Sequence, residues 1–159
     1  MPNKTKGNLA WGTSTWIFLH WFAENINEVF YSLNNKIIIR YISDIFNSLP
    51  CPTCKNHAQT YMKKYNINLA TTKELLKLYL FRFHNAVNAR KGVKIEENSI
   101  LEEYQAKKGI EVLKIWNRDF INPLGVVTYD FMNKSNITKC KQNMIRLVKT
   151  KQNQFTNLY

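Results

Sequence analysis

The chain has 159 residues, of which 45% are hydrophobic and 13% aromatic, so we expect one domain with one apolar core. This composition excludes an intrinsically disordered chain, and it supplies a core that needs few disulfides or metals. No apolar run is long enough to cross a bilayer, and the polar first ten residues lack the apolar stretch of a signal peptide. We therefore expect a cytoplasmic protein that does not enter the membrane.

The net charge of +12 is spread unevenly along the chain. Residues 131–159 carry six Lys or Arg and no Asp or Glu, so they hold half of the excess positive charge. The simpler interpretation is a solvated basic tail, and the sharper one is contact with nucleic acid or another acidic surface. We expect the simpler one, because a run of charge shows composition only.

Two helices are predicted in the first third of the chain, over residues 12–31 and 36–49. A Thr-Ser pair can cap the first, and large apolar residues then recur at helical spacing. The sequence Leu-Asn-Asn at 33–35 is expected to separate the two helices. In the second helix, isoleucines recur at intervals of four and three residues, which favours a helix over a strand, and Pro50 ends it.

Two further helices carry clear start and stop signals. A third helix, over residues 52–65, begins with a proline, which suits the first helical position because its missing N–H has no partner there. A fourth helix, over 73–91, is capped by Thr71 or Thr72 and closed by Gly92. Four antiparallel helices joined by short loops predict a helical bundle.

The rest of the chain gives weaker signals. Ser99 can cap a short fifth helix over residues 100–108, which Gly109 is expected to end. Residues 122–131 combine turn-forming residues with a short β-like run. Residues 140–149 fit one more amphipathic helix.

Two of the three cysteines, Cys51 and Cys54, form a Cys-x-x-Cys motif, for which three interpretations compete. With His57 they supply three zinc ligands, but a structural zinc site needs four, and only a chance approach of His84 or Cys140 would complete it. A static disulfide suits neither a cytoplasmic protein nor so short a loop. A redox pair is favoured by the helix that begins beside it, because a helix N-terminus stabilises a thiolate.

A redox pair in a helical bundle needs an electron acceptor. A thioredoxin-like protein carries its motif after a β-strand, whereas the residues before Cys51 are predicted to be helical. A cofactor in the bundle core is the alternative acceptor. Rings for stacking, amides for hydrogen bonds and a cation for phosphate are supplied by Trp16, His20, His84, Asn85, Asn88 and Lys91. Each residue alone is more often an ordinary core or helix-end residue, but together they suit a dinucleotide.

Three segments resemble the signatures of the Erv/ALR-type FAD-dependent sulfhydryl oxidases, and their order and spacing match as well. They are WGTSTWIFLH at 11–20, CPTC at 51–54 and FHNAVNARKG at 83–92. The likeness runs from about residue 11 to about residue 107. It is strongest to the short, single-domain forms encoded by large DNA viruses.

The resemblance implies an all-α fold: a four-helix bundle with a short fifth helix that holds FAD, followed by a basic C-terminal extension of uncertain structure. It divides the chain into an N-terminal segment, 1–10, an FAD-binding thiol oxidase domain, 11–108, and an extension, 109–159, that is basic from about residue 131. It also implies a homodimer packed through the first two helices. The enzyme would oxidise paired thiols of a partner, pass two electrons to FAD and reduce O₂ to hydrogen peroxide.

The resemblance also implies roles for individual residues. Cys54 would lie against the flavin ring and form the charge-transfer contact, and Cys51 would exchange with the incoming dithiol. The cofactor-binding positions would be Gly12, Trp16, His20, Cys54, His57, His84, Asn85, Asn88, Lys91, Lys94 and Tyr104. Which of the two lysines meets the FAD phosphates stays open, because the family's lysine after Leu-Gly is replaced here by Lys-Gly-Val-Lys.

The chain departs from its cellular relatives in its cysteines. Residues 93–139 contain none, so Cys140 is the only one beyond the motif, and no second pair exists to shuttle electrons from the substrate. The oxidase is therefore expected to depend on a separate thioredoxin-like carrier or dithiol protein, in the host cytoplasm or the virion if it is viral. Cys140 itself would be a free tail thiol or would bond to a second copy or a partner.

A second function class stays open beside the oxidase. A basic helical protein could hold zinc through Cys51, Cys54 and His57 and bind nucleic acid with its positive charge. This module would be colourless and would contain zinc, whereas the oxidase would be yellow. Of the two, we expect the oxidase, with nucleic acid an improbable partner.

Overall fold

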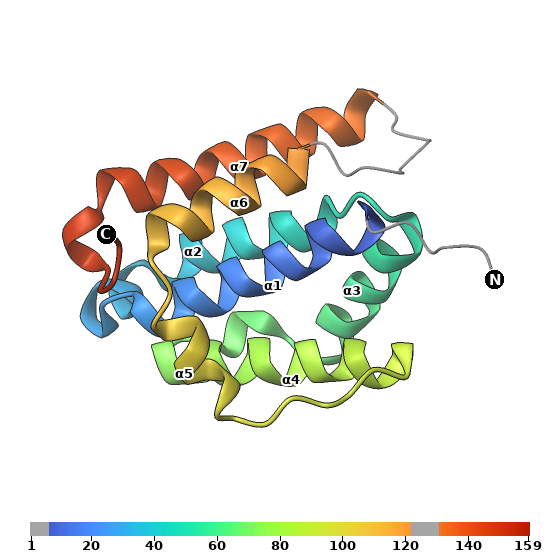
Figure 1. Ribbon diagram of the computed structural model, residues 1–159, viewed down its shortest axis with the longest axis horizontal. Helices are drawn as coiled ribbons and strands as arrows, with labels where there is room; N and C mark the ends of the chain where they lie inside the picture. Colours follow the sequence, from blue (N-terminus) through green and yellow to red (C-terminus); the bar gives the residue numbers. More distant parts are fainter. Residues whose placement is uncertain (1–6, 122–130) are drawn as a thin grey trace.

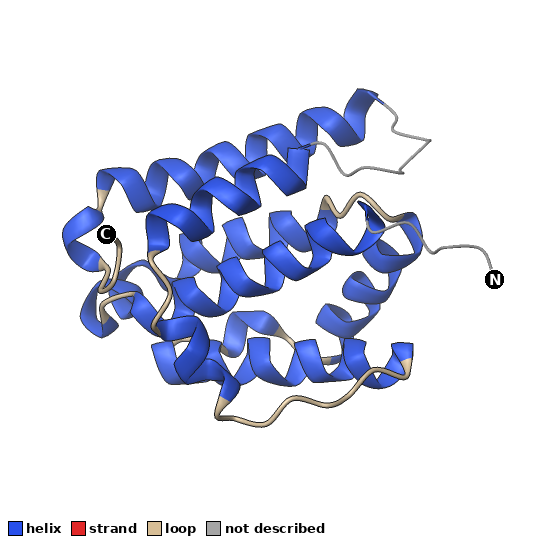
Figure 2. Ribbon diagram, viewed as in Figure 1, coloured by secondary structure: helices blue, strands red, loops and turns tan. Residues whose placement is uncertain are grey.

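The computed structural model describes residues 7–121 and 131–159, and it confirms the predicted all-α fold (Figure 2). Among these residues lie α1 (Gly7–Asn25), α2 (Glu28–Asn47), α3 (Pro52–Lys64), α4 (Lys73–Lys91), α5 (Ile100–Gln105), α6 (Gly109–Ile121) and α7 (Phe131–Thr150). Two short 3₁₀-helices, Ile67–Leu69 and Gln152–Gln154, complete the regular structure there. None of the described helices has the length and apolar character needed to cross a membrane.

The helices form three layers, with α1 and α2 in the middle (Figure 1). Helices α3, α4 and α5 pack on one side of this pair, and α6 and α7 pack on the other, α6 against α1 and α7 against α2. The resemblance implied subunit contact through the first two helices. In this chain α6 and α7 occupy one side of that pair, so a second copy finds that side already covered.

The predicted first helix is present, but it runs over Gly7–Asn25 rather than 12–31, so the Thr-Ser pair lies inside it and the chain breaks earlier. The N-cap of α2 is Asn27, whose side chain accepts a hydrogen bond from the backbone N–H of Phe30. This side-chain cap starts α2 at Glu28, three residues after α1 ends. The expected break at 33–35 lies inside α2, where the side chain of Asn34 donates to the carbonyl of Phe30 and leaves the helix intact.

The predictions for α3 and α4 are confirmed to within a residue. Helix α3 begins with proline at its first position. The Thr72 hydroxyl caps α4 by accepting from the N–H of Leu75, 3.3 Å away. Gly92 ends α4 in the left-handed region, with φ of 65°, which glycine adopts without strain.

The expected solvated tail is wrong, because α6 and α7 are folded onto the bundle. Helix α6 was not predicted, and α7 begins at residue 131 rather than at 140. Trp116 of α6 is fully buried, stacks on Phe18 with ring centroids 4.1 Å apart, and donates to the Thr15 hydroxyl. Helix α7 buries Met144 and Val148 while exposing most of its cations. The predicted turn and β-like run lie largely outside the described residues.

The last residues of the chain join three helix ends. The backbone N–H of Thr156 donates to Asn25 at the end of α1, and Gln154 accepts from Asn27 at the start of α2. The first two N–H groups of α6, from Gly109 and its neighbour, donate to the carbonyls of residues 157 and 158. Gly109 was expected to end the fifth helix, but it starts α6, and α5 ends at residue 105.

Candidate active site

The cysteine motif lies at the N-terminus of α3, after the loop that leaves α2. Cys51 is the N-cap of α3, and its sulfur accepts a hydrogen bond from the backbone N–H of Cys54 at 3.2 Å. The two cysteines are joined as a disulfide, with their Cα atoms 5.1 Å apart. Both sulfurs therefore lie at the positive end of a 13-residue helix, where a thiolate released from the bond is stabilised.

A small cavity of about 50 Å³ lies beside Cys54 and is enclosed by α1, α2, α3 and α4. Its walls include Gly12 and Trp16 of α1, His57 of α3 and Phe83 of α4, while Cys51 does not line it. The two cysteines thus differ in position, because Cys54 lines the cavity and Cys51 does not. The sequence predicted that Gly12, Trp16, Cys54 and His57 share one site, and the structure brings them together.

A cluster of four stacked rings lies next to the cavity, between α1, α4 and α5. The indole of Trp16 stacks on the imidazole of His84, with ring centroids 4.4 Å apart and planes at 8°. The imidazole of His20 stacks on the phenol of Tyr104 at 4.9 Å and 10°. A hydrogen bond of 3.0 Å joins His20 Nε2 to His84 Nδ1 across the cluster. All four residues belong to the predicted cofactor site, and three separate helices bring them into contact.

The two histidines of this cluster are uncharged at neutral pH. Burial, with the nearby His84, lowers the pKa of His20 to about 3, and burial, with the nearby Lys91, lowers the pKa of His84 to about 4. One ring therefore donates its N–H and the other accepts it, and neither carries a positive charge. Neutral, stacked rings suit the flat face of an aromatic cofactor better than a buried cation would.

One buried polar atom of the site has no hydrogen-bond partner among the described residues: Nδ1 of His57. Such atoms are rare in folded proteins, because each costs about 1–3 kcal/mol when left unpaired. His57 also lines the cavity beside Cys54, so a molecule bound there would be within reach of this nitrogen. A polar ring bound beside the dithiol could supply the missing hydrogen-bond partner of this imidazole nitrogen.

Cations border the same cavity at the C-terminal end of α4. Both Arg90 and Lys91 line it, and burial together with Arg90 lowers the pKa of Lys91. The sequence predicted Lys91 but missed Arg90. The available signal was helical spacing, because Arg90 follows Val87 by three residues and both line the cavity. Lys94 is exposed in the loop after α4 and does not line the cavity, whereas Lys91 does.

The two asparagines of the fourth helix occupy different environments. Asn85 makes two hydrogen bonds to the backbone of Glu96: its Nδ2 donates to the carbonyl at 3.0 Å and its Oδ1 accepts from the N–H at 2.9 Å. This amide therefore clamps the loop between α4 and α5. Asn88 is buried, with an exposed fraction of 8%, on the side of α4 that carries His84. Of the two, Asn88 is the one whose side chain is not engaged with this loop, four residues after His84 on the same helix.

The third cysteine, Cys140, is buried in a helix and does not belong to a solvent-exposed tail. Cys140 is 3% exposed in α7, and its thiol donates to the carbonyl of Ile137. It is free, and burial raises the pKa of its thiol to about 12. A thiol that is both buried and protonated is a poor nucleophile, so the geometry opposes a disulfide between two copies of this residue.

The zinc interpretation finds no support in the geometry. The two motif cysteines are bonded to each other, which removes the thiolates that zinc requires. Across residues 7–121 and 131–159, no group of three His, Cys, Asp or Glu side chains is placed to hold a metal ion. The site is instead a disulfide beside neutral rings and cations.

Comparison with known proteins agrees with this arrangement. The model of the Erv1 / Alr family matches residues 13–107, and the chain therefore belongs to this family. The FAD-linked sulfhydryl oxidase of African swine fever virus is 28% identical over 113 residues, which cover 71% of this chain and 94% of that protein. A relative from Invertebrate iridescent virus 3 is 32% identical over 81 residues, covering 50% of this chain and 55% of its own length. No solved structure matches the chain.

These findings confirm the class that the sequence resemblance predicted. The chain is a sulfhydryl oxidase that uses FAD, with thiols as its substrates and O₂ as its oxidant. The match covers α1 to α5 and ends before α6, so the two C-terminal helices lie beyond the family model.

Proposed function

We propose that Cys51 and Cys54 are the redox-active pair of this oxidase and that FAD binds beside Cys54, between α1, α3 and α4. The observation that carries the proposal is the position of the two sulfurs. Cys54 lines the cavity with Trp16 and His57, whereas Cys51 does not. One cysteine is thus placed to exchange electrons with a cofactor and the other to meet a substrate thiol.

The residues around the cavity fit a flavin dinucleotide in their chemistry. Trp16, His84 and Tyr104 offer flat ring faces, His57 offers the unpaired Nδ1, and Lys91 offers a cation for the pyrophosphate. His20, Asn88 and Gly12 complete the set, with Asn85 holding the adjoining loop. Because the cavity is only about 50 Å³, the side chains that line it must move apart to admit the cofactor.

The thiol chemistry follows from the same positions. A substrate thiolate attacks the sulfur of Cys51, the Cys51–Cys54 bond breaks, and Cys54 leaves as a thiolate next to the cavity. The second substrate thiolate then attacks the mixed disulfide at the substrate sulfur, forms the product disulfide and releases Cys51. Bound FAD would accept the two electrons of the reduced pair and supply them to O₂, which yields hydrogen peroxide. Cys51 and Cys54 close again as a disulfide in the same step in which they give up these two electrons.

The electron donor is proposed to be a dithiol protein or a thioredoxin-like carrier. Many enzymes of this kind pass electrons through a second cysteine pair, but this chain has only three cysteines. Cys140 is buried in α7 and lies on a different helix from the motif. The incoming dithiol must therefore reach Cys51 from a separate molecule.

Homodimer formation is a separate part of the proposal. Because α6 and α7 cover one side of the α1–α2 pair, a second copy would dock on the apolar stripe of α2 formed by Val29, Leu33 and Ile37. These side chains recur every four residues and are 65%, 80% and 40% exposed. Light scattering would show a dimer that Leu33→Glu converts to a monomer. A wild-type monomer would reject the dimer and leave the oxidase proposal intact.

The cytoplasm of the host cell, or the virion, is the proposed location. The relatives in the comparison come from large DNA viruses, which supports a role inside an infected cell. Fractionation of infected cells with an antibody against the chain would test it. Recovery only from the secretory compartment would contradict it.

The oxidase proposal is tested by a pair of cysteine substitutions. Cys54→Ser is expected to keep bound FAD, seen as yellow absorbance, and to reduce oxygen uptake with dithiothreitol by about a thousandfold or more. Cys140→Ser, the matched control, should keep both the colour and the turnover, because its thiol is buried in α7 and takes no part in the motif disulfide. Normal turnover by Cys54→Ser would remove this cysteine from the mechanism.

A further inference from the structure

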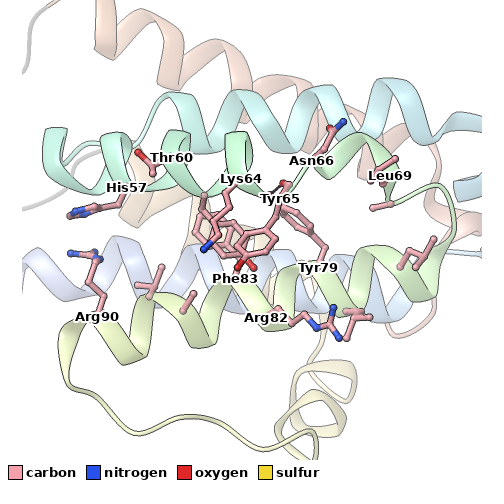
Figure 3. Close-up of a pocket in the computed structure, with 16 residues that line it drawn as sticks. His57, Thr60, Lys64, Tyr65, Asn66, Leu69, Tyr79, Arg82, Phe83 and Arg90 are labelled. Atoms are coloured by element: carbon pink, nitrogen blue, oxygen red, sulfur yellow. Dashed lines mark hydrogen bonds between the residues drawn. The ribbon is translucent and has the colours of Figure 1, made fainter.

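An open groove of about 820 Å³ runs between α3 and α4 (Figure 3). Its walls are formed by α3, the 3₁₀-helix that follows and α4, and side chains of the two long helices face one another across it. Tyr61 and Phe83 stack with ring centroids 4.1 Å apart, and Tyr79 donates from its hydroxyl to the carbonyl of Tyr65. Aromatic rings thus form the floor of a long channel that opens to solvent.

The charge of the groove has one sign. Lys64 of α3 and Arg82 and Arg90 of α4 line it, and no Asp or Glu is among its lining residues. The rim adds exposed apolar side chains, with Leu69, 70% exposed, the most accessible of them. Cations above an aromatic floor attract a chain that carries both carboxylates and apolar side chains.

The groove lies on the side of α4 away from the ring cluster. Arg82 and Ala86 lie two residues before and after His84, which places them about half a helical turn away. His20, His84 and Asn88 do not line the groove. Of the residues proposed above to bind FAD, only His57 also lines the groove.

One end of the groove adjoins the cavity beside Cys54. His57, Phe83, Val87 and Arg90 line both the groove and the cavity beside Cys54. A segment lying in the groove would therefore end close to the N-terminus of α3, where Cys51 and Cys54 lie. A polypeptide bound in the groove would therefore extend toward the reacting sulfurs.

We propose that this groove docks an acidic, apolar-rich segment of the dithiol protein that the oxidase acts on. The segment lies along Lys64 and Arg82, and the neighbouring thiol pair of the same protein reaches Cys51. The proposal rests on the function proposed above, and it adds a binding surface that selects the substrate by charge. Small dithiols need no such surface, so the groove acts on protein substrates only.

The test uses three synthetic peptides that share a Cys-x-x-Cys dithiol. Its flanks carry Leu with either Glu, Gln or Lys, and oxygen uptake by the FAD-loaded enzyme gives kcat/KM for each. The Glu peptide is expected to exceed the Lys peptide by about tenfold at low ionic strength, and the preference should shrink as salt is added. Equal kcat/KM values for the three peptides would overturn the proposal.

Two double variants with reversed charges test whether the charge preference arises in the groove. Lys64→Glu with Arg82→Glu should lower kcat/KM for the Glu peptide about tenfold and leave oxidation of dithiothreitol unchanged. The control, Arg146→Glu with Lys149→Glu, makes the same change of charge at two exposed positions of α7 and should change neither rate. Equal losses in the two double variants would show a bulk charge effect and would also overturn the proposal.

The remaining outcomes separate this surface from the function itself. Loss of yellow absorbance in the Lys64 and Arg82 double variant would assign the groove to the cofactor, which contradicts substrate docking. Failure of the wild-type enzyme to oxidise dithiothreitol would reject the role of Cys51 and Cys54, whatever the peptides show. A direct titration of the dithiol-free Glu peptide, with both cysteines replaced by serine, should show binding that the double variant lacks.

Discussion

The helices α1 to α5 and the helices α6 and α7 both bury large aromatic rings, but they treat polar groups differently. The first set buries His20, Glu24 and Asn88 and holds the unpaired Nδ1 of His57. In the second set, the buried side chains are almost all apolar, as with Trp116 and Met144. The first region thus accepts costly polar burial, as active sites do, and the second supplies apolar packing that offsets it.

One contact shows how the second region supports the first. The indole N–H of Trp116 donates to the Thr15 hydroxyl at 3.2 Å, and that hydroxyl donates to the carbonyl of Trp11. Both α1 residues line the cavity beside Cys54. Helix α6 therefore supports the α1 residues that line the cavity, and it does so through Trp116, which lies beyond the residues matched by the family model.

The largest expected effect breaks this support directly. Trp116→Ala removes a fully buried indole and should lower the free energy of unfolding by about 3–5 kcal/mol. Urea unfolding followed by circular dichroism measures it, with Ile115→Ala, 42% exposed on the same helix, as the control. A single transition that shifts as a whole would show that the two regions unfold together. Two transitions, with the first region unmoved, would make α6 and α7 a separate unit.

The second prediction uses pH, because all three histidines lie in the first region. The pKa values of His20 and His84 are lowered in the folded state, to about 3 and about 4, from an unfolded value near 6.5. Below pH 6.5 the unfolded chain binds protons that the folded chain does not, so stability falls by up to about 1.4 kcal/mol per pH unit for each ring. Above pH 6.5 the two histidines add no pH dependence.

Urea midpoints measured between pH 4.5 and 7.5 test this prediction. His20→Gln removes one of the two titrating rings and should flatten the acid side of the curve relative to the wild type. A substitution in the second region has no histidine to remove, so Thr138→Ala in α7 serves as the control with an unchanged slope. Identical slopes for wild type and His20→Gln would contradict neutral, buried histidines.

The third prediction concerns the loop that Asn85 clamps. Asn85→Ala removes two hydrogen bonds to Glu96, which should lower the free energy of opening this loop by about 1–2 kcal/mol. Hydrogen exchange at the Glu96 N–H should become faster, while Asn98→Ala, exposed in the same loop, leaves it unchanged. Weakened FAD binding with unchanged exchange would instead assign the side chain to the cofactor.

The smallest effects come from two glycines, one in each region. A Cβ at Gly12 meets no atom within 4 Å, so Gly12→Ala should raise helix stability in the FAD-free protein by about 0.5–1 kcal/mol. It should also weaken FAD binding, because Gly12 lines the cavity. A Cβ at Gly109 would overlap the indole of Trp21, so Gly109→Ala should destabilise the protein. Thermal unfolding and FAD titration measure both, and equal shifts in the two variants would contradict the difference.

The sequence predicted best where local chemistry decides the structure. Thr72 and Gly92 carry the cap and the left-handed end of α4 in their own side chains and backbone freedom. The cysteine motif and the two polar helix faces predicted most of the residues that meet in the candidate site, since residues four apart share a face in any helix. The family signatures then identified the class that the comparisons confirmed.

The failures came where distant contacts decide. Asn27 caps α2, but the sequence offered the competing polar run at 33–35, and only packing makes that run part of a helix. Helix α6 was missed although Val112, Trp116 and Phe120 recur every four residues, because Gly109 reads as a stop. The clamp by Asn85 and the contact between the rings of His20 and His84 join residues 11 and 64 positions apart, which spacing cannot reveal.

The joining of three helix ends by residues 154–158 has a consequence for biosynthesis. The carbonyls that receive the first N–H groups of α6, and the backbone that pairs with the turn between α1 and α2, belong to residues that a ribosome adds only after α7. Helices can form earlier during translation, but these ends have no partners until residues 154–158 have been made. A chain that stops before residue 154 would therefore lack the hydrogen-bond partners of the end of α1 and the starts of α2 and α6.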